Sequence, residues 1–172
     1  VSSNQLALAR FNTGHRSEAV RQWQTQAEGG DAAAQFTLGV LYNRGDGGVA
    51  RDMIEAARWY RKAAEQGHVV AQFNLGILHA TGNGVSHDAA AAIEWWRLAA
   101  MQGHAEAQFN LGLLYAEGTG VSPNPAEAVK WWSMAADQGL AAAQFNLGLM
   151  YMKGEGIDEN QDEALRLWRM SA

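Results

Sequence analysis

The apolar residues of this chain recur at the spacing of a helical face, in paired blocks joined by glycine-rich segments. Residues 104–116 contain no proline, and their apolar positions stand at i, i+4, i+7 and i+8: Ala107, Leu111, Leu114 and Tyr115. That spacing predicts one amphipathic helix. Gly118 follows, where a left-handed residue ends a helix at little cost, and a short Gly-x-Gly-Val loop leads to the next block.

The second block carries small, large and small residues at i, i+4 and i+7, which is again one helical face. The four copies are Ala56, Tyr60 and Ala63; Ala92, Trp96 and Ala99; Ala128, Trp132 and Ala135; and Ala164, Trp168 and Ser171. A large ring that recurs at one phase beside alanines suits a core seam between stacked helices. We therefore expect these rings to be buried, in preference to forming a carbohydrate or cation platform.

The pairs of blocks are copies of one another. The segment Ala-Gln-Phe-Asn-Leu-Gly occurs at 71–76, 107–112 and 143–148, and a near-copy with threonine stands at 34–39. Its glutamines lie 37, 36 and 36 residues apart, at positions 35, 72, 108 and 144. A fixed period in the thirties predicts an all-α solenoid in which each helical hairpin packs on its neighbours.

The start of each second helix is marked by a column of cap residues, spaced by 36: Asp52, Asp88, Asn124 and Asn160. Glutamate follows three residues later in three of the four copies, a pattern that predicts a capping box. Pro125 stands at a first helical position, where its missing N–H costs nothing.

These signals predict about five hairpins and ten helices in one continuous solenoid. Residues 1–30 form a shorter N-terminal hairpin, and four repeats follow at 31–67, 68–103, 104–139 and 140–172. No polar capping helix follows the last repeat, so we expect a fragment of a longer protein or a contact in trans, such as self-association through this C-terminal end.

The composition of the chain limits the classes of partner that it can bind. The net charge is −5 and the chain has only three lysines, so no basic stripe is available for nucleic acid. No apolar run approaches the roughly 20 residues of a membrane span. Cysteine is absent, which excludes disulfides and thiol chemistry and suits cytosol and periplasm equally.

No motif in the chain indicates catalysis, a metal or a cofactor. None of the serines begins Ser-x-x-Lys or lies in Gly-x-Ser-x-Gly. The histidines lack metal-ligand spacing, and His68 and His104 would stand about 10 Å apart, one repeat from each other. The Gly-x-Gly loops do not follow a strand, so they do not form a nucleotide fingerprint. We expect no enzyme activity and no cofactor.

The chain resembles the Sel-one-like repeat family, relatives of the tetratricopeptide repeats. The family order of Ala, Leu-Gly and Tyr, then Gly-x-Gly-Val, then Asp, Ala, Trp and Ala-Ala, ending in Gln-Gly, is met by residues 31–172. The resemblance implies a right-handed α/α superhelix and adaptor or scaffold work, often in bacterial envelope, secretion or quality-control systems. A penicillin-binding branch of the family is rich in cysteine, and this cysteine-free chain departs from it. The alternative function is a small-ligand-binding or hydrolytic, penicillin-binding-like repeat protein.

The same resemblance implies a protein-binding strip on the concave side, formed by first helices. Its members are Phe36, Phe73, Phe109 and Phe145, with Asn74, Asn110 and Asn146 beside them and Val40, Ile77, Leu113 and Leu149 one turn on. The asparagines can hydrogen-bond a bound backbone, and Arg44, Glu117 and Lys153 stand near the edge. Alternatively, each phenylalanine packs against the next hairpin, and the sequence leaves both possibilities open.

Overall fold

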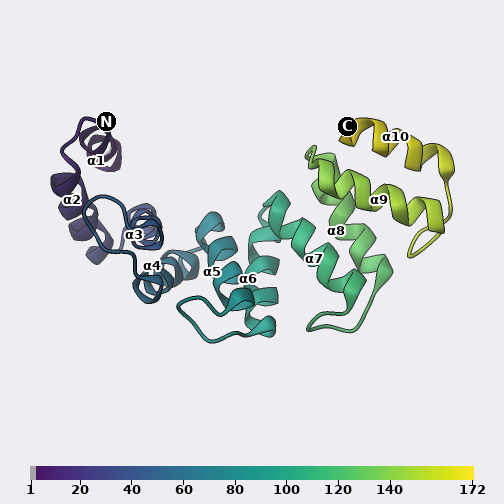
Figure 1. Cartoon of the computed structure of the whole chain (residues 1–172), viewed down its shortest axis with the longest axis horizontal. Coiled ribbons are helices and arrows are strands. Elements are labelled where there is room, and N and C mark those ends of the chain that lie inside the picture. The colour runs from purple at the N-terminus through teal and green to yellow at the C-terminus, as the bar shows by residue number, and fades with distance from the viewer. Residues whose placement is uncertain (1–2) are drawn as a thin grey trace. The chain divides into compact units, whose positions relative to one another are not determined.

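The computed structural model describes residues 3–172, and this range is all-α, as predicted. The first two residues of the expected 1–30 hairpin lie outside it. The ten helices of the described range are α1 (Ser3–Asn12), α2 (Arg16–Glu28), α3 (Ala32–Arg44), α4 (Met53–Glu65), α5 (Val69–Thr81), α6 (Ala89–Met101), α7 (Ala105–Glu117), α8 (Pro125–Asp137), α9 (Ala141–Lys153) and α10 (Gln161–Ser171) (Figure 1).

The chain forms two compact units. One runs to Asp88 and contains α1–α5, and the other extends from Ala89 to Ala172 and contains α6–α10. Within each unit, every helix packs against the next helix along the chain. This succession of neighbours is the packing that a repeat architecture requires, because each hairpin buries its apolar face only against adjacent helices.

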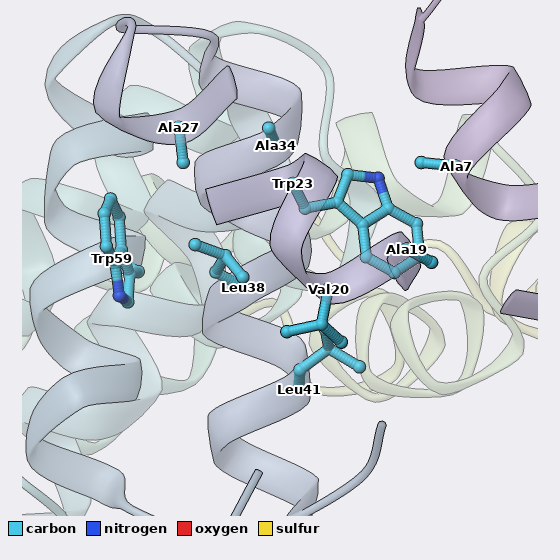
Figure 2. Packing of buried hydrophobic residues seen from close by; sticks show 9 residues of the cluster. All are labelled: Ala7, Ala19, Val20, Trp23, Ala27, Ala34, Leu38, Leu41 and Trp59. Atoms are coloured by element: carbon cyan, nitrogen blue, oxygen red, sulfur yellow. The ribbon is translucent and has the colours of Figure 1, made fainter. Parts of the chain in front are cut away.

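The core of the first unit is a seam of alanines, aliphatic residues and large rings. Figure 2 shows this cluster, in which Trp23 of α2 lies among small residues and Val20 lies near Leu41 of α3. Trp23 is only 2% exposed, and Tyr60 of α4 is 1% exposed. The expected burial of the second-helix rings is confirmed for Tyr60, Trp96 and Trp132, whereas Trp168 of α10 is only half-buried.

The rings of Tyr60, Trp132 and Trp168 each pack directly against the glycine of a Leu-Gly pair in the preceding first helix. A Cβ added at Gly112 would overlap the Trp132 indole, and one at Gly39 would overlap the Tyr60 ring. The Trp132 indole N–H also donates to the carbonyl of Phe109, at 3.2 Å. Glycine is therefore needed because the ring occupies the space in which a side chain would stand.

The expected caps are present at three second helices, but the capping box is only half formed. Asp52, Asn124 and Asn160 each accept a hydrogen bond from the backbone N–H three residues on. The second bond of a capping box, from the backbone N–H of the cap residue to the glutamate side chain, was wrongly predicted. Each cap residue instead donates this N–H to a tyrosine carbonyl in the preceding helix. The glutamates instead pair with a basic residue three positions later, as Glu163 does with Arg166.

Four buried glutamines join each first helix to the second helix before it. The side-chain amides of Gln35, Gln72, Gln108 and Gln144 donate to alanine carbonyls near the ends of those helices, at 3.0, 3.1, 3.0 and 3.2 Å. In two repeats the glutamine oxygen also accepts a bond from a second glutamine, as Gln108 does from Gln138 at 2.8 Å. Gln35 and Gln108 thus bond through both the nitrogen and the oxygen of the carboxamide, whereas the buried oxygen of Gln144 has no hydrogen-bond partner among the described residues.

Candidate functional site

The predicted strip residues lie on α3 and α5 in the first unit and on α7 and α9 in the second. All are half-buried except Phe145, which is 50% exposed. Partial burial suits a surface that helps to hold the fold and still presents side chains outward. The asparagines and aliphatic residues differ from the phenylalanines in what surrounds them, and the two groups are described separately.

In the first unit, Asn74 and Ile77 line a recess of about 190 Å³. Tyr60 and Asn43 contribute to its wall, and Arg51 lies at its edge near the loop after α3. Burial raises the pKa of the Tyr60 hydroxyl, although hydrogen bonding to Asn43 and Asn74 acts in the opposite direction. The hydroxyl is therefore protonated at neutral pH, and the recess has an uncharged polar wall beside an aliphatic one.

The second unit contains the matching recess, also of about 190 Å³. Trp96 replaces Tyr60, and Asn110 and Leu113 replace Asn74 and Ile77 at the same positions of the repeat. Glu117, expected near the edge of the strip, lines this recess. In both units, a second-helix ring thus meets an asparagine and an aliphatic residue from the next first helix.

The phenylalanines do not line these recesses. The Phe36 ring stacks on the His68 imidazole with centroids 4.5 Å apart, and it lies 5.9 Å from the Tyr60 ring. This is the packing alternative, realised at one position. Phe145 lies 6.3 Å from Trp168 and remains half exposed, so its ring packs at one edge and is open to solvent on the rest.

Two histidines have a structural role that the sequence pattern did not reveal. His68 and His104 are the N-caps of α5 and α7, and their Nδ1 atoms accept bonds from the N–H groups of Ala71 and Ala107 at 3.3 and 3.4 Å. Burial lowers the pKa of both imidazoles, while the Glu106 carboxylate acts against this shift at His104. An accepting Nδ1 requires the neutral ring with its proton on Nε2.

No group of three or more His, Asp or Glu side chains within residues 3–172 is placed to hold a metal ion. None of the helices in the same range is long and apolar enough to cross a membrane.

The Sel1 repeat family model matches four consecutive segments, 32–68, 69–104, 105–140 and 141–172. No curated protein is similar enough to match the chain.

Several solved structures are similar to the chain. A Sel1 repeat protein from Oxalobacter formigenes is 35% identical with a TM-score of 0.92, and the match covers 98% of this chain and 71% of that one. A protective antigen of uropathogenic Escherichia coli with an SLR fold is 38% identical with a TM-score of 0.84, over 88% of this chain. This chain spans about a third of the length of that antigen, with 32% covered. A Sel1 repeat protein from Klebsiella pneumoniae is 26% identical with a TM-score of 0.58, and the match covers 98% of this chain and 84% of that one.

Proposed function

The chain belongs to the Sel1 repeat family, whose members generally mediate protein–protein interactions, and from this premise we propose that it is a non-catalytic scaffold. In this proposal, it binds a partner polypeptide along the first-helix strip of each unit. The asparagines at 74, 110 and 146 hydrogen-bond the partner backbone, and the aliphatic residues one turn on receive its apolar side chains.

The observation that carries the proposal is the recurrence of one recess in both units. Each recess pairs an asparagine with an aliphatic residue three positions later, beside a ring from the preceding second helix. An extended chain offers backbone amides and alternate side chains to such a surface, so carboxamides give affinity and apolar recesses give selectivity. Two small recesses are suited to single side chains of a polypeptide.

The polar groups in the recesses also favour binding over catalysis. They are mainly carboxamides and a neutral tyrosine hydroxyl, with Arg51 in one recess and Glu117 in the other. General acid–base catalysis needs a titratable pair within reach of a reacting group. His68 and His104, whose pKa values are lowered, use their Nδ1 atoms to cap helices.

The test begins with identification of the partner by pull-down from the source organism, followed by affinity measurements on the purified pair. We expect Ile77→Ala with Leu113→Ala to weaken binding at least tenfold, because central apolar anchors contribute most to such interfaces. The matched control is Leu165→Ala, which shortens an exposed aliphatic side chain on α10. Circular dichroism checks that helicity is retained.

The proposal fails if the folded double variant binds as tightly as the parent chain. It also fails if Leu165→Ala weakens binding as much as the strip variant does, because the contact would then not depend on the recesses.

A further inference from the structure

A larger recess lies between α6, α7 and α8 in the second unit. Its volume is about 620 Å³, and it is lined from α6 by Arg97 and Met101, from α7 by Tyr115, and from α8 by Glu127, Lys130, Trp131 and Met134. None of these residues belongs to the first-helix strip. The recess is thus a separate surface feature of the unit that begins at Ala89.

The apolar part of this recess is unusually open. Met101 is 70% exposed and Met134 is 40% exposed, while Trp131 is almost fully buried. Methionine side chains are unbranched and polarisable, so they adapt to apolar groups of differing shape. Their exposure beside a rigid indole leaves apolar surface in water that an apolar side chain of a partner would cover.

The charge in the recess is positive. Lys130 is neutralised by Glu127, with nitrogen–oxygen distances of 3.3 Å, and its ammonium also lies 5.3 Å from the Trp131 ring centre. Arg97 instead donates to the neutral Tyr115 hydroxyl, at 3.2 Å. Within residues 3–172, no carboxylate lies at ion-pair distance from Arg97, so its charge is uncompensated.

Tyr115 adds a second donor beside the guanidinium. Its oxygen accepts the bond from Arg97, so the hydroxyl keeps its own proton to donate. A carboxylate that reached this point could accept from both groups, and hydrogen bonds between charged partners are roughly twice as strong as neutral ones.

The equivalent recess one repeat later provides an internal comparison. Its volume is about 270 Å³, and there Ser133 replaces Arg97 and Asp137 replaces Met101. Ser133 donates to the carbonyl of Val129 in its own helix, and Arg166 is paired with Glu163. The residual charge is therefore negative at the later recess and positive at the earlier one.

We propose that the recess at Arg97 binds a polypeptide segment in which a large apolar side chain lies next to an acidic side chain. The apolar side chain covers Met101, Met134 and the edge of Trp131. The carboxylate accepts from Arg97 and Tyr115. The recess between α6, α7 and α8 thereby recognises an acidic–apolar segment, independently of what the first-helix strip binds.

The probes are two capped dipeptides of nearly equal shape, acetyl-Glu-Leu-amide and acetyl-Gln-Leu-amide, titrated into the isotopically labelled chain. The indole N–H resonance of Trp131, assigned by its loss in Trp131→Phe, reports occupancy by nuclear magnetic resonance. We expect saturable shifts with a dissociation constant of about 1 mM for the acidic dipeptide, as ligand efficiencies for so small a ligand allow. The glutamine isostere should bind about tenfold more weakly, because it loses the charge-assisted bonds.

The variants separate charge from apolar contact. Arg97→Gln should abolish the preference for the acidic dipeptide, and Arg97→Lys should keep part of it because the charge remains. Met134→Ala should weaken the binding of both dipeptides by a similar factor. The matched control, Asp137→Asn at the later recess, should leave the Trp131 titration unchanged.

Equal affinity of the parent chain for the two dipeptides would overturn the proposal, as would an acid preference that survives in Arg97→Gln. Absence of a saturable shift at the Trp131 indole with either probe would overturn it as well. Dispersion of the amide spectrum checks the fold of each variant.

Discussion

Two regions of the repeat differ in how much their residue types vary from copy to copy. The seams under the second-helix rings vary little, whereas the N-termini of the first helices vary widely. At the seams, a large ring lies over glycine and between alanines, and the same residue classes recur in each copy. At the N-termini, the cap is Asp31, His68, His104 or Leu140, and the leucine forms no side-chain cap bond. Close packing admits few shapes, whereas an N–H in the first turn of a helix can bond to several kinds of acceptor.

The strongest test of this difference removes a ring from the seam. Trp132→Ala should lower the free energy of unfolding by about 3–5 kcal/mol, because it leaves a cavity among residues that are almost fully buried. Denaturant unfolding followed by circular dichroism measures the change. Met134→Ala on the same helix is the control, since that side chain is 40% exposed. Equal losses in the two variants would show that the seam has no special role.

The second test adds one carbon to the seam. In a free helix, Gly→Ala stabilises by about 1 kcal/mol, but Gly112→Ala should destabilise by about 1–3 kcal/mol because the methyl meets the Trp132 indole. The midpoint of denaturant unfolding shows whether Gly112→Ala raises or lowers the stability. Combining Gly112→Ala with Trp132→Ala should cost less than the sum of the two changes, since the cavity accommodates the methyl.

The third test adds a side-chain cap at Leu140, the N-cap of α9, where no side-chain cap bond forms. Leu140 has φ −71° and ψ 105°, close to the −68° and 113° of Asp31, whose carboxylate accepts from the N–H of Ala34 at 2.7 Å. Leu140→Asp should therefore gain a cap worth about 0.5–1 kcal/mol, less the loss of apolar contact from a half-buried leucine. A gain in thermal midpoint is expected, with Leu140→Ala as the control that loses contact and gains no acceptor.

The smallest effect is a pH dependence from the histidine caps. Burial lowers the pKa of His68 and His104 below the usual value of about 6.5, so the unfolded chain takes up protons first as the pH falls. Their contribution to stability is complete above about pH 6.5 and is lost as the pH decreases below it. His68→Asn keeps an acceptor at the cap but does not titrate. Its stability should decline less between pH 7 and pH 5 than that of the parent chain, and an identical decline would exclude this cause.

Much of the fold follows from short-range patterns that sequence alone displays. The spacing of Ala128, Trp132 and Ala135 identifies the buried face of α8, and the cap column locates the starts of α4, α8 and α10. The period of the Ala-Gln-Phe-Asn-Leu-Gly segment identifies a repeat array. The helix faces and the caps are local features, because they involve residues no more than one or two turns apart. The repeat array is identified by comparing the copies directly.

The candidate site could be predicted only in part from the sequence. The family resemblance predicts the strip of asparagines and aliphatic residues, of which Asn74 and Ile77 line one recess and Asn110 and Leu113 line the other. That Phe36 stacks on His68 could not be read from phase, because the two rings belong to different repeats and stand 32 positions apart. The recess at Arg97 was likewise hidden, since it combines residues from three helices.

By itself, the sequence determined the helices and their buried faces, because these depend on periodicity within a few turns. It also determined the repeat, because copies of one segment recur 36 or 37 residues apart. The tertiary structure alone decided which partners the buried polar groups have. The glutamine amides bond to carbonyls of the preceding helix, and the cap residues return their N–H to a tyrosine carbonyl instead of a glutamate. Such choices depend on which backbone groups packing brings within about 3 Å of each other, and a pattern of residue types does not encode that distance.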